Sequence, residues 1–152
     1  MEHSLPGPMP HSVTWLGYGG LLPFLVLAPA SLVDPQHARL WNAALLTYAA
    51  VILTFVGALH WGFAMALRDL SASRRTRCFV WSVVPALLAW SAFLFSPMLA
   101  SLLLVTGFLA HYWQDRLLCA ASHLPSWYLP LRFRLTTVAC LCLMAGAFAE
   151  TS

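Results

Sequence analysis

Apolar residues gather in long runs along the chain instead of alternating with polar ones. A helix needs about 20 apolar residues to cross a bilayer. On this basis we predict membrane-spanning helices over residues 13–32, 40–67, 79–95, 98–113 and 135–149. Only Ser96 and Pro97 separate the third run from the fourth, which predicts a tight turn there. The pattern predicts an all-α integral membrane protein, a bundle of five transmembrane helices forming one domain over residues 13–149.

Composition agrees with this interpretation. Hydrophobic residues make up 61% of the 152 residues and charged residues 9%, against about 25% charged in soluble domains. A soluble enzyme, a disordered chain and a nucleic-acid binder are therefore excluded. The four cysteines lack the spacing of zinc or haem-attachment motifs. We therefore expect no metal ligands, and we assign no catalytic residue.

The arginines predict an orientation. All eight basic residues are arginine, and five spans would place seven of them on one side: Arg68, Arg74, Arg75, Arg77, Arg116, Arg132 and Arg134. Positive charge marks the cytoplasmic side, so residues 1–12 are expected to form a cytoplasmic tail and the C-terminus to lie outside. Arginine-only usage suggests a GC-rich bacterial genome.

Residues 120–134 are predicted to form a cytoplasmic interfacial loop. The segment contains two prolines, Pro125 and Pro130, which argue against one continuous helix. Trp127 and Tyr128 suit the membrane interface. The arginines at 132 and 134 would face anionic head groups. Anionic lipids at the cytoplasmic face are therefore expected partners.

Two of the predicted spans contain helix-breaking residues. Pro23 removes the backbone donor that would serve the carbonyl of Gly19, and Gly17 and Gly20 weaken the same stretch. Pro85 does the same inside the third span. Interrupted helices at membrane depth can mark ligand sites, but prolines in membrane helices are also repaired by neighbouring groups.

The second span carries two faces of small residues. Ala50, Thr54, Ala58, Gly62 and Ala66 recur every four residues, which lets another helix approach closely. His60 lies on the opposite face between Gly57 and Ala64. We therefore expect this span to be central in the bundle, with His60 facing protein instead of lipid.

Two histidines and one carboxylate fall in the predicted cytoplasmic half. Asp115 follows His111 by four residues, so the two share one helix face. His60 and His111 have similar predicted depths and would meet if their spans packed together. Imidazole ligates haem iron, so His60 and His111 are candidate ligands of a haem or a quinone-like molecule.

Several motifs resemble the transmembrane protein 69-like family of small membrane proteins. They are the run G-G-L-L-P-F from Gly19, the pattern Y-x-x-x-I-L-x-F-x-G-x-x-H-W-G from Tyr48, P-x-x-x-x-W from Pro85, Asp115, and P-x-W-Y-x-x-L-R-x-x-L-T from Pro125. The resemblance covers residues 12–148. It implies five spans in a bacterial inner membrane or in mitochondria, and no known reaction. The candidate functional residues are Gly19, Pro23, Tyr48, Gly57, His60, Trp61, Gly62, Pro85, Asp115, Trp127, Tyr128 and Arg132.

Four functional hypotheses follow. The favoured one is a non-enzymatic accessory or assembly subunit of a larger membrane complex, because the loops are short and no catalytic motif occurs. The second is the haem or quinone binder. The third is a proton-coupled transporter or channel that uses the broken first helix and His60. The fourth is a lipid-modifying enzyme using head-group-level residues, with Asp69, Asp115 and His111 among them.

Overall fold

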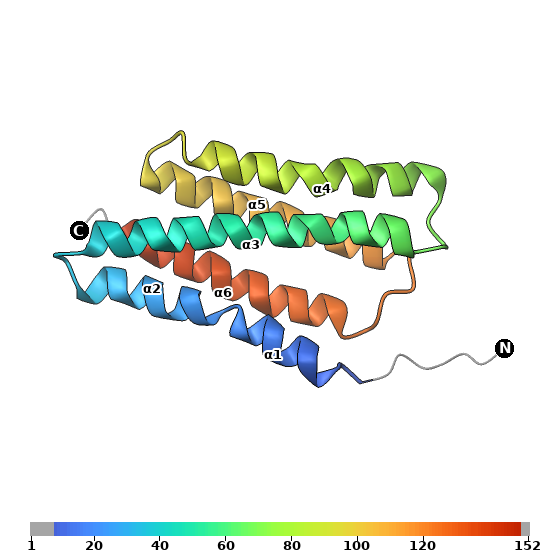
Figure 1. Ribbon diagram of the computed structural model, residues 1–152, viewed down its shortest axis with the longest axis horizontal. Coiled ribbons are helices and arrows are strands. Elements are labelled where there is room, and N and C mark those ends of the chain that lie inside the picture. Colours follow the sequence, from blue (N-terminus) through green and yellow to red (C-terminus); the bar gives the residue numbers. More distant parts are fainter. Residues whose placement is uncertain (1–7, 150–152) are drawn as a thin grey trace.

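The chain folds entirely into helices over the residues that can be described, 8–149 of a computed structural model. These residues contain no strand. The six helices lie side by side, and successive long helices run in opposite directions (Figure 1). The predicted all-α class is therefore confirmed. The helices are α1 (His11–Gly19), α2 (Leu22–Val33), α3 (Ala38–Ala66), α4 (Ala72–Ala92), α5 (Pro97–Cys119) and α6 (Tyr128–Ala149).

The first apolar run is broken into α1 and α2, as its glycines and proline predict. Pro23 lies in the first turn of α2, where a backbone N–H would have no partner within the helix. The hydroxyl of Tyr48 on α3 donates a hydrogen bond to the carbonyl of Gly20, at 2.9 Å. A backbone group exposed by the break is thus satisfied by a neighbouring helix, as apolar surroundings require.

Three helix ends differ from the predicted spans. Helix α4 begins at Ala72 instead of residue 79, and α5 continues to Cys119 instead of ending at 113. Helix α6 begins at Tyr128, so only residues 120–127 of the predicted 120–134 loop are non-helical. Pro130 is the third residue of α6, where its missing donor costs no helical bond. The segment is not one continuous helix, as the prolines predict, but the predicted loop is too long, because residues 128–134 belong to α6.

Helix α3 is the central element. It packs against α2, α4, α5 and α6, as its small residues predict. The face that carries Gly57, His60 and Ala64 is buried against these neighbours. A Cβ on Gly57 would lie 2.9 Å from ring carbons of Pro85. Gly57 therefore allows α3 and α4 to approach at the proline of α4.

The second small-residue face does not pack as predicted. Thr54, Ala58, Gly62 and Ala66 are exposed, and only Ala50 of that row is buried. Nothing lies within 4 Å of a Cβ placed on Gly62. The opposite face turns inward because it carries the polar His60, which is costly to leave in hydrocarbon.

Three helical segments are long and apolar enough to cross a membrane: residues 11–33, α3 and α6. The surface of the bundle is rich in exposed large apolar side chains such as Leu25, Phe55 and Trp90, which suits contact with lipid. Helices α4 and α5 are not among the three. Polar residues lower their hydropathy: α4 has three arginines in its first two turns, and α5 has Gln114, Asp115 and Arg116 near its end.

Candidate functional site

The carboxylate of Asp115 is the centre of a buried polar cluster. It is fully buried on α5. Its Oδ1 accepts hydrogen bonds from Nε2 of His60, at 3.0 Å, and from the hydroxyl of Tyr128, also at 3.0 Å. Its Oδ2 accepts a hydrogen bond from Nε of Arg132, at 2.8 Å. One carboxylate therefore ties together α3, α5 and α6.

Helical periodicity explains how α5 and α6 supply these groups. Tyr128 and Arg132 are four residues apart on α6, and His111 and Asp115 are four apart on α5, so each pair shares one helix face. His60 comes from α3. We call these five residues the Asp115 cluster: His60, His111, Asp115, Tyr128 and Arg132.

His111 is held by a hydrogen bond on its other side. Its Nδ1 accepts from the indole Nε1 of Trp81 on α4, at 3.0 Å. An Nδ1 that accepts carries no proton, so the neutral ring has its proton on Nε2. This Nε2 lies 3.7 Å from Oδ1 of Asp115. The rings of His60 and His111 meet edge to face, with centroids 4.9 Å apart, as their predicted depths suggested.

The charges of the cluster balance. Asp115 and Arg132 form a buried ion pair, and Arg132 is only 6% exposed. Removing one partner of such a pair costs about 3–5 kcal/mol, because the other charge is left buried alone. Among the described residues, Nε2 of His111, Nη2 of Arg132 and Oγ1 of Thr136 are buried without a hydrogen-bond partner. The cluster thus retains polar capacity beyond its internal bonds.

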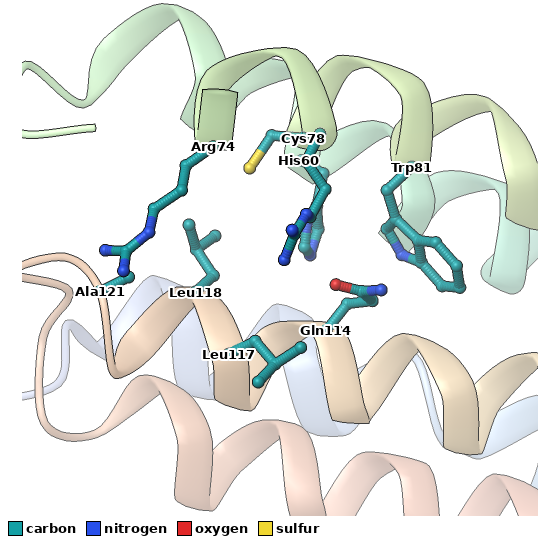
Figure 2. A pocket seen from close by; sticks show the side chains of 9 residues that line it. His60, Arg74, Cys78, Trp81, Gln114, Leu117, Leu118 and Ala121 are labelled. Carbon is teal, nitrogen blue, oxygen red and sulfur yellow. The ribbon is translucent and has the colours of Figure 1, made fainter. Parts of the chain in front are cut away.

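A small, partly open cavity reaches the edge of this cluster. Its volume is about 50 Å³, enough for a few water molecules. It lies between α4 and α5, with His60 at its inner side (Figure 2). The side chains that matter for its chemistry are His60, Arg74, Arg77, Trp81 and Gln114.

Haem does not fit between the two histidines. Pockets for ligands of that size occupy about 300–1,000 Å³, whereas this cavity measures about 50 Å³. The edge-to-face contact of His60 with His111 leaves no slot for a flat macrocycle. The geometry thus gives no support to the proposed haem ligands.

A metal ion at the same place would disturb existing bonds. Ligand atoms of His60, His111 and Asp115 lie within 4.8 Å of one another, so their spacing alone resembles a metal site. However, Arg132 already neutralises the carboxylate. With its Nδ1 accepting from Trp81, His111 can offer Nε2 to a metal only as an imidazolate. The set therefore fits an ion-pair cluster better than a metal centre.

The other candidate residues lie in four separate places. Tyr48 meets the break near Gly19 and Pro23 through Gly20, and Gly57 packs on Pro85. Trp61 and Gly62 are exposed on α3, away from the face that carries His60. Trp127 contacts the ring of Tyr128, with centroids 6.5 Å apart, and so lies beside the cluster.

The sequence reasoning missed the role of Arg75. Its guanidinium donates hydrogen bonds to the carbonyls of Ala64 and Leu67 at the end of α3, the latter at 2.9 Å. Cations at a helix C-terminus satisfy its free carbonyls. The only available signal was that Arg75 is a basic residue shortly after the end of α3. We had used it only as a positive charge that indicates orientation.

A second hydrogen-bonded pair of side chains joins two loops at the same end of the bundle. Oδ2 of Asp69 accepts hydrogen bonds from Nδ1 of His123, at 2.9 Å, and from its backbone N–H, at 3.1 Å. These bonds, the side-chain one first, hold the pKa of the Asp69 carboxyl below its usual value. Asp69 is therefore engaged with a loop, whereas Asp115 is engaged with the buried cluster.

Comparison with known proteins identifies the family. Transmembrane protein 69 of Xenopus tropicalis is 34% identical over 143 residues, an alignment that takes in 90% of this chain and 54% of that protein. The chain thus spans about half the length of the curated relative it matches. No solved structure matches it significantly. The profile of the family described as "Protein of unknown function (DUF3429)" matches residues 9–148. The resemblance found in the motifs is confirmed, and the chain belongs to this transmembrane protein 69-like family of membrane proteins.

Proposed function

We propose that the chain is a five-span protein of the bacterial inner membrane, with its N-terminus in the cytoplasm and its C-terminus outside. The start of α1, the α3–α4 loop and the α5–α6 loop lie at one end of the bundle (Figure 1). Seven of the eight arginines belong to these loops or to the adjacent helix turns. Positive charge at one end supports a cytoplasmic location for that end, in contact with anionic lipids.

Reporter fusions in the host test this arrangement. Fusions after the α3–α4 loop and after the α5–α6 loop are expected to report the cytoplasm, and fusions in the α2–α3 and α4–α5 loops the outside. Fusions on the two sides of the α4–α5 pair that report opposite compartments would contradict five spans. The bacterial assignment rests on arginine-only usage, and fractionation of the inner membrane tests it.

We further propose that the chain acts as a non-enzymatic accessory or assembly subunit of a larger membrane complex. The observation that carries this proposal is the closed state of the Asp115 cluster. Both carboxylate oxygens bond to side chains of the same chain, and the adjoining cavity holds only a few waters. Such a cluster stabilises one packing of the helices, and its carboxylate is not free to act on a substrate.

The transporter alternative rests on two features, the broken first helix and His60, and the first has a structural role instead. The hydroxyl of Tyr48 bonds to the carbonyl at the break between α1 and α2, so this group is engaged within the protein. His60, the other feature, still lines the cavity.

Affinity purification from the native host tests the accessory role. A tagged chain extracted in mild detergent is expected to bring down one membrane protein in near-stoichiometric amount. A lone chain in every detergent would overturn the proposal.

A matched pair of variants locates the contact surface. Gly62→Leu and Gly19→Leu both add a side chain where nothing lies within 4 Å of a new Cβ. We expect Gly62→Leu to release the partner, because the exposed row of small residues on α3 is the place where a partner helix can approach closely. Gly19→Leu should retain it. Equal retention by both variants would exclude the α3 face as the contact.

A further inference from the structure

His60 gives the cavity between α4 and α5 a hydrogen-bond acceptor. The carboxylate of Asp115 is paired with Arg132 and can only accept hydrogen bonds. Nε2 of His60 therefore donates to it, and the proton of the neutral ring lies on Nε2. This leaves a lone pair on Nδ1. His60 is 2% exposed and lines the cavity.

Helix α4 supplies donors to the cavity. Arg74 and Arg77 line it, and in the described part of the chain neither guanidinium has a hydrogen bond or ion pair. The amide of Gln114 lies across the cavity from α4 (Figure 2). Arg75, between the two, turns away to the carbonyls of α3. The cavity thus combines the guanidinium groups of Arg74 and Arg77 with the acceptor Nδ1 of His60.

This combination selects a particular ligand chemistry. Guanidinium groups bind phosphate with strong charge-assisted hydrogen bonds. An imidazole nitrogen with a lone pair at such a cavity accepts from water, and a ligand without a donor would displace that water without replacing its hydrogen bond. The preferred ligand therefore carries a phosphate together with a hydroxyl group.

We propose that this cavity binds an anionic phosphate ester that also offers a hydroxyl donor, with Arg74 and Arg77 on the phosphate and Nδ1 of His60 accepting from the hydroxyl. Asp115 is a positioning residue, because it holds the tautomer of His60 through Nε2. Two sources carry this chemistry: a phospholipid head group such as phosphatidylglycerol, and a water-soluble phosphate. The lipid source rests on the proposed membrane placement of this end of the bundle, whereas binding itself does not depend on the accessory role.

Native mass spectrometry of the delipidated full chain in detergent tests the proposal. The protein is mixed with equal amounts of phosphatidylglycerol and phosphatidylcholine, and the retained lipid is counted. We expect preferential retention of phosphatidylglycerol. The Arg74→Gln/Arg77→Gln variant should lose this preference by roughly tenfold, the effect of removing charge-assisted hydrogen bonds.

The control removes the same charge outside the cavity. Arg68 and Arg116 are exposed at the same end of the bundle and do not line it. Arg68→Gln/Arg116→Gln should therefore bind like the wild type. An equal loss in both double variants would indicate attraction to general surface charge and would overturn the proposal.

The acceptor is tested by lipid chemistry. Phosphatidylmethanol has the same charge as phosphatidylglycerol and no hydroxyl. His60→Gln places an amide where Nε2 stood, retaining a donor for Asp115 and removing the Nδ1 acceptor. We expect the wild type to prefer phosphatidylglycerol over phosphatidylmethanol and His60→Gln to lose that preference. If the wild type binds the two lipids equally, the assigned role of His60 is wrong.

Competition distinguishes the two sources. If excess inorganic phosphate or glycerol phosphate displaces the lipid in the wild type, a soluble ligand occupies the cavity. If the lipid resists displacement, the head group is the ligand. Binding of neither probe in a manner sensitive to Arg74 and Arg77 would overturn the site. Because the assay runs in detergent without a partner, its failure is separate from failure of the accessory role or of the topology.

Discussion

Arg132 of α6 donates from Nε to Oδ2 of Asp115 on α5 across 2.8 Å, in a part of the bundle where both side chains are buried. The two residues are 17 apart in sequence and are separated by the α5–α6 connection. This ion pair fixes how α6 lies on α5 and presents the carboxylate to His60 and Tyr128. The stability of the bundle is therefore expected to depend on the pair more than on any single surface charge.

The first prediction concerns this pair. Arg132→Met should destabilise the protein by about 3–5 kcal/mol, because Asp115 would be left buried without a counter-charge. Adding Asp115→Asn should recover part of the loss by removing the stranded charge. Unfolding in mixed micelles followed by circular dichroism measures both. As a control, Arg134→Met removes an exposed arginine bonded only to the Tyr18 hydroxyl and should cost no more than about 1 kcal/mol. Equal losses at positions 132 and 134 would contradict the prediction.

The second prediction compares two glycines of α3. Gly57→Ala should destabilise the bundle by about 1–3 kcal/mol, because the new Cβ would lie 2.9 Å from the ring of Pro85 and push α4 away. Gly62→Ala meets open space and should be neutral or stabilising by up to about 1 kcal/mol through helix propensity. The same unfolding assay separates the two, and a stable Gly57→Ala variant would show that α3 and α4 do not need this close approach.

The third prediction concerns the junction of α1 and α2. Tyr48→Phe removes the hydroxyl that bonds to the Gly20 carbonyl and should cost about 1–3 kcal/mol, the penalty for an unsatisfied buried polar group. Hydrogen exchange around residues 17–25 should quicken, while exchange in α5 should not change. Tyr18→Phe, which removes a hydroxyl bonded at the exposed surface, serves as the control. Unchanged exchange at the junction in Tyr48→Phe would argue against a structural role for this bond.

The fourth prediction concerns pH at the loops that join α3 to α4 and α5 to α6. The pKa of Asp69 is lowered, chiefly by the hydrogen bond from the side chain of His123. A lowered pKa in the folded state means that the contact stabilises the protein above the ordinary aspartate pKa of about 3.9, and that this stabilisation is lost as the pH falls through the lower value.

His123→Ala tests that relationship. It should raise the pKa of Asp69 toward its ordinary value, because only backbone hydrogen bonds would still lower it. NMR titration of the side-chain carboxyl measures this shift. Asp34 is the internal control, because its pKa is lowered chiefly by the indole of Trp41 at the other end of the bundle. A shift at Asp34 equal to that at Asp69 would indicate a global change instead of a lost contact.

The sequence by itself determined the class and much of the local structure. Long apolar runs with few charges can form only membrane helices, because backbone groups in hydrocarbon must bond within the segment. The break at Gly20 follows from glycine and proline. The pairing of His111 with Asp115 follows from helical periodicity. The burial of His60 follows from the cost of leaving a polar ring in lipid.

The tertiary structure alone decided what these residues meet. His60 reaches Asp115 across 55 residues of chain, and Trp81 of α4 reaches His111 across 30, distances over which periodicity carries no information. Only packing decided that Tyr128 and Arg132 begin a helix facing the carboxylate instead of lying on the membrane surface. The same packing left the row through Gly62 exposed. Local patterns specify which face of a helix is apolar or small, whereas the choice of partner depends on how all the helices together bury their polar groups.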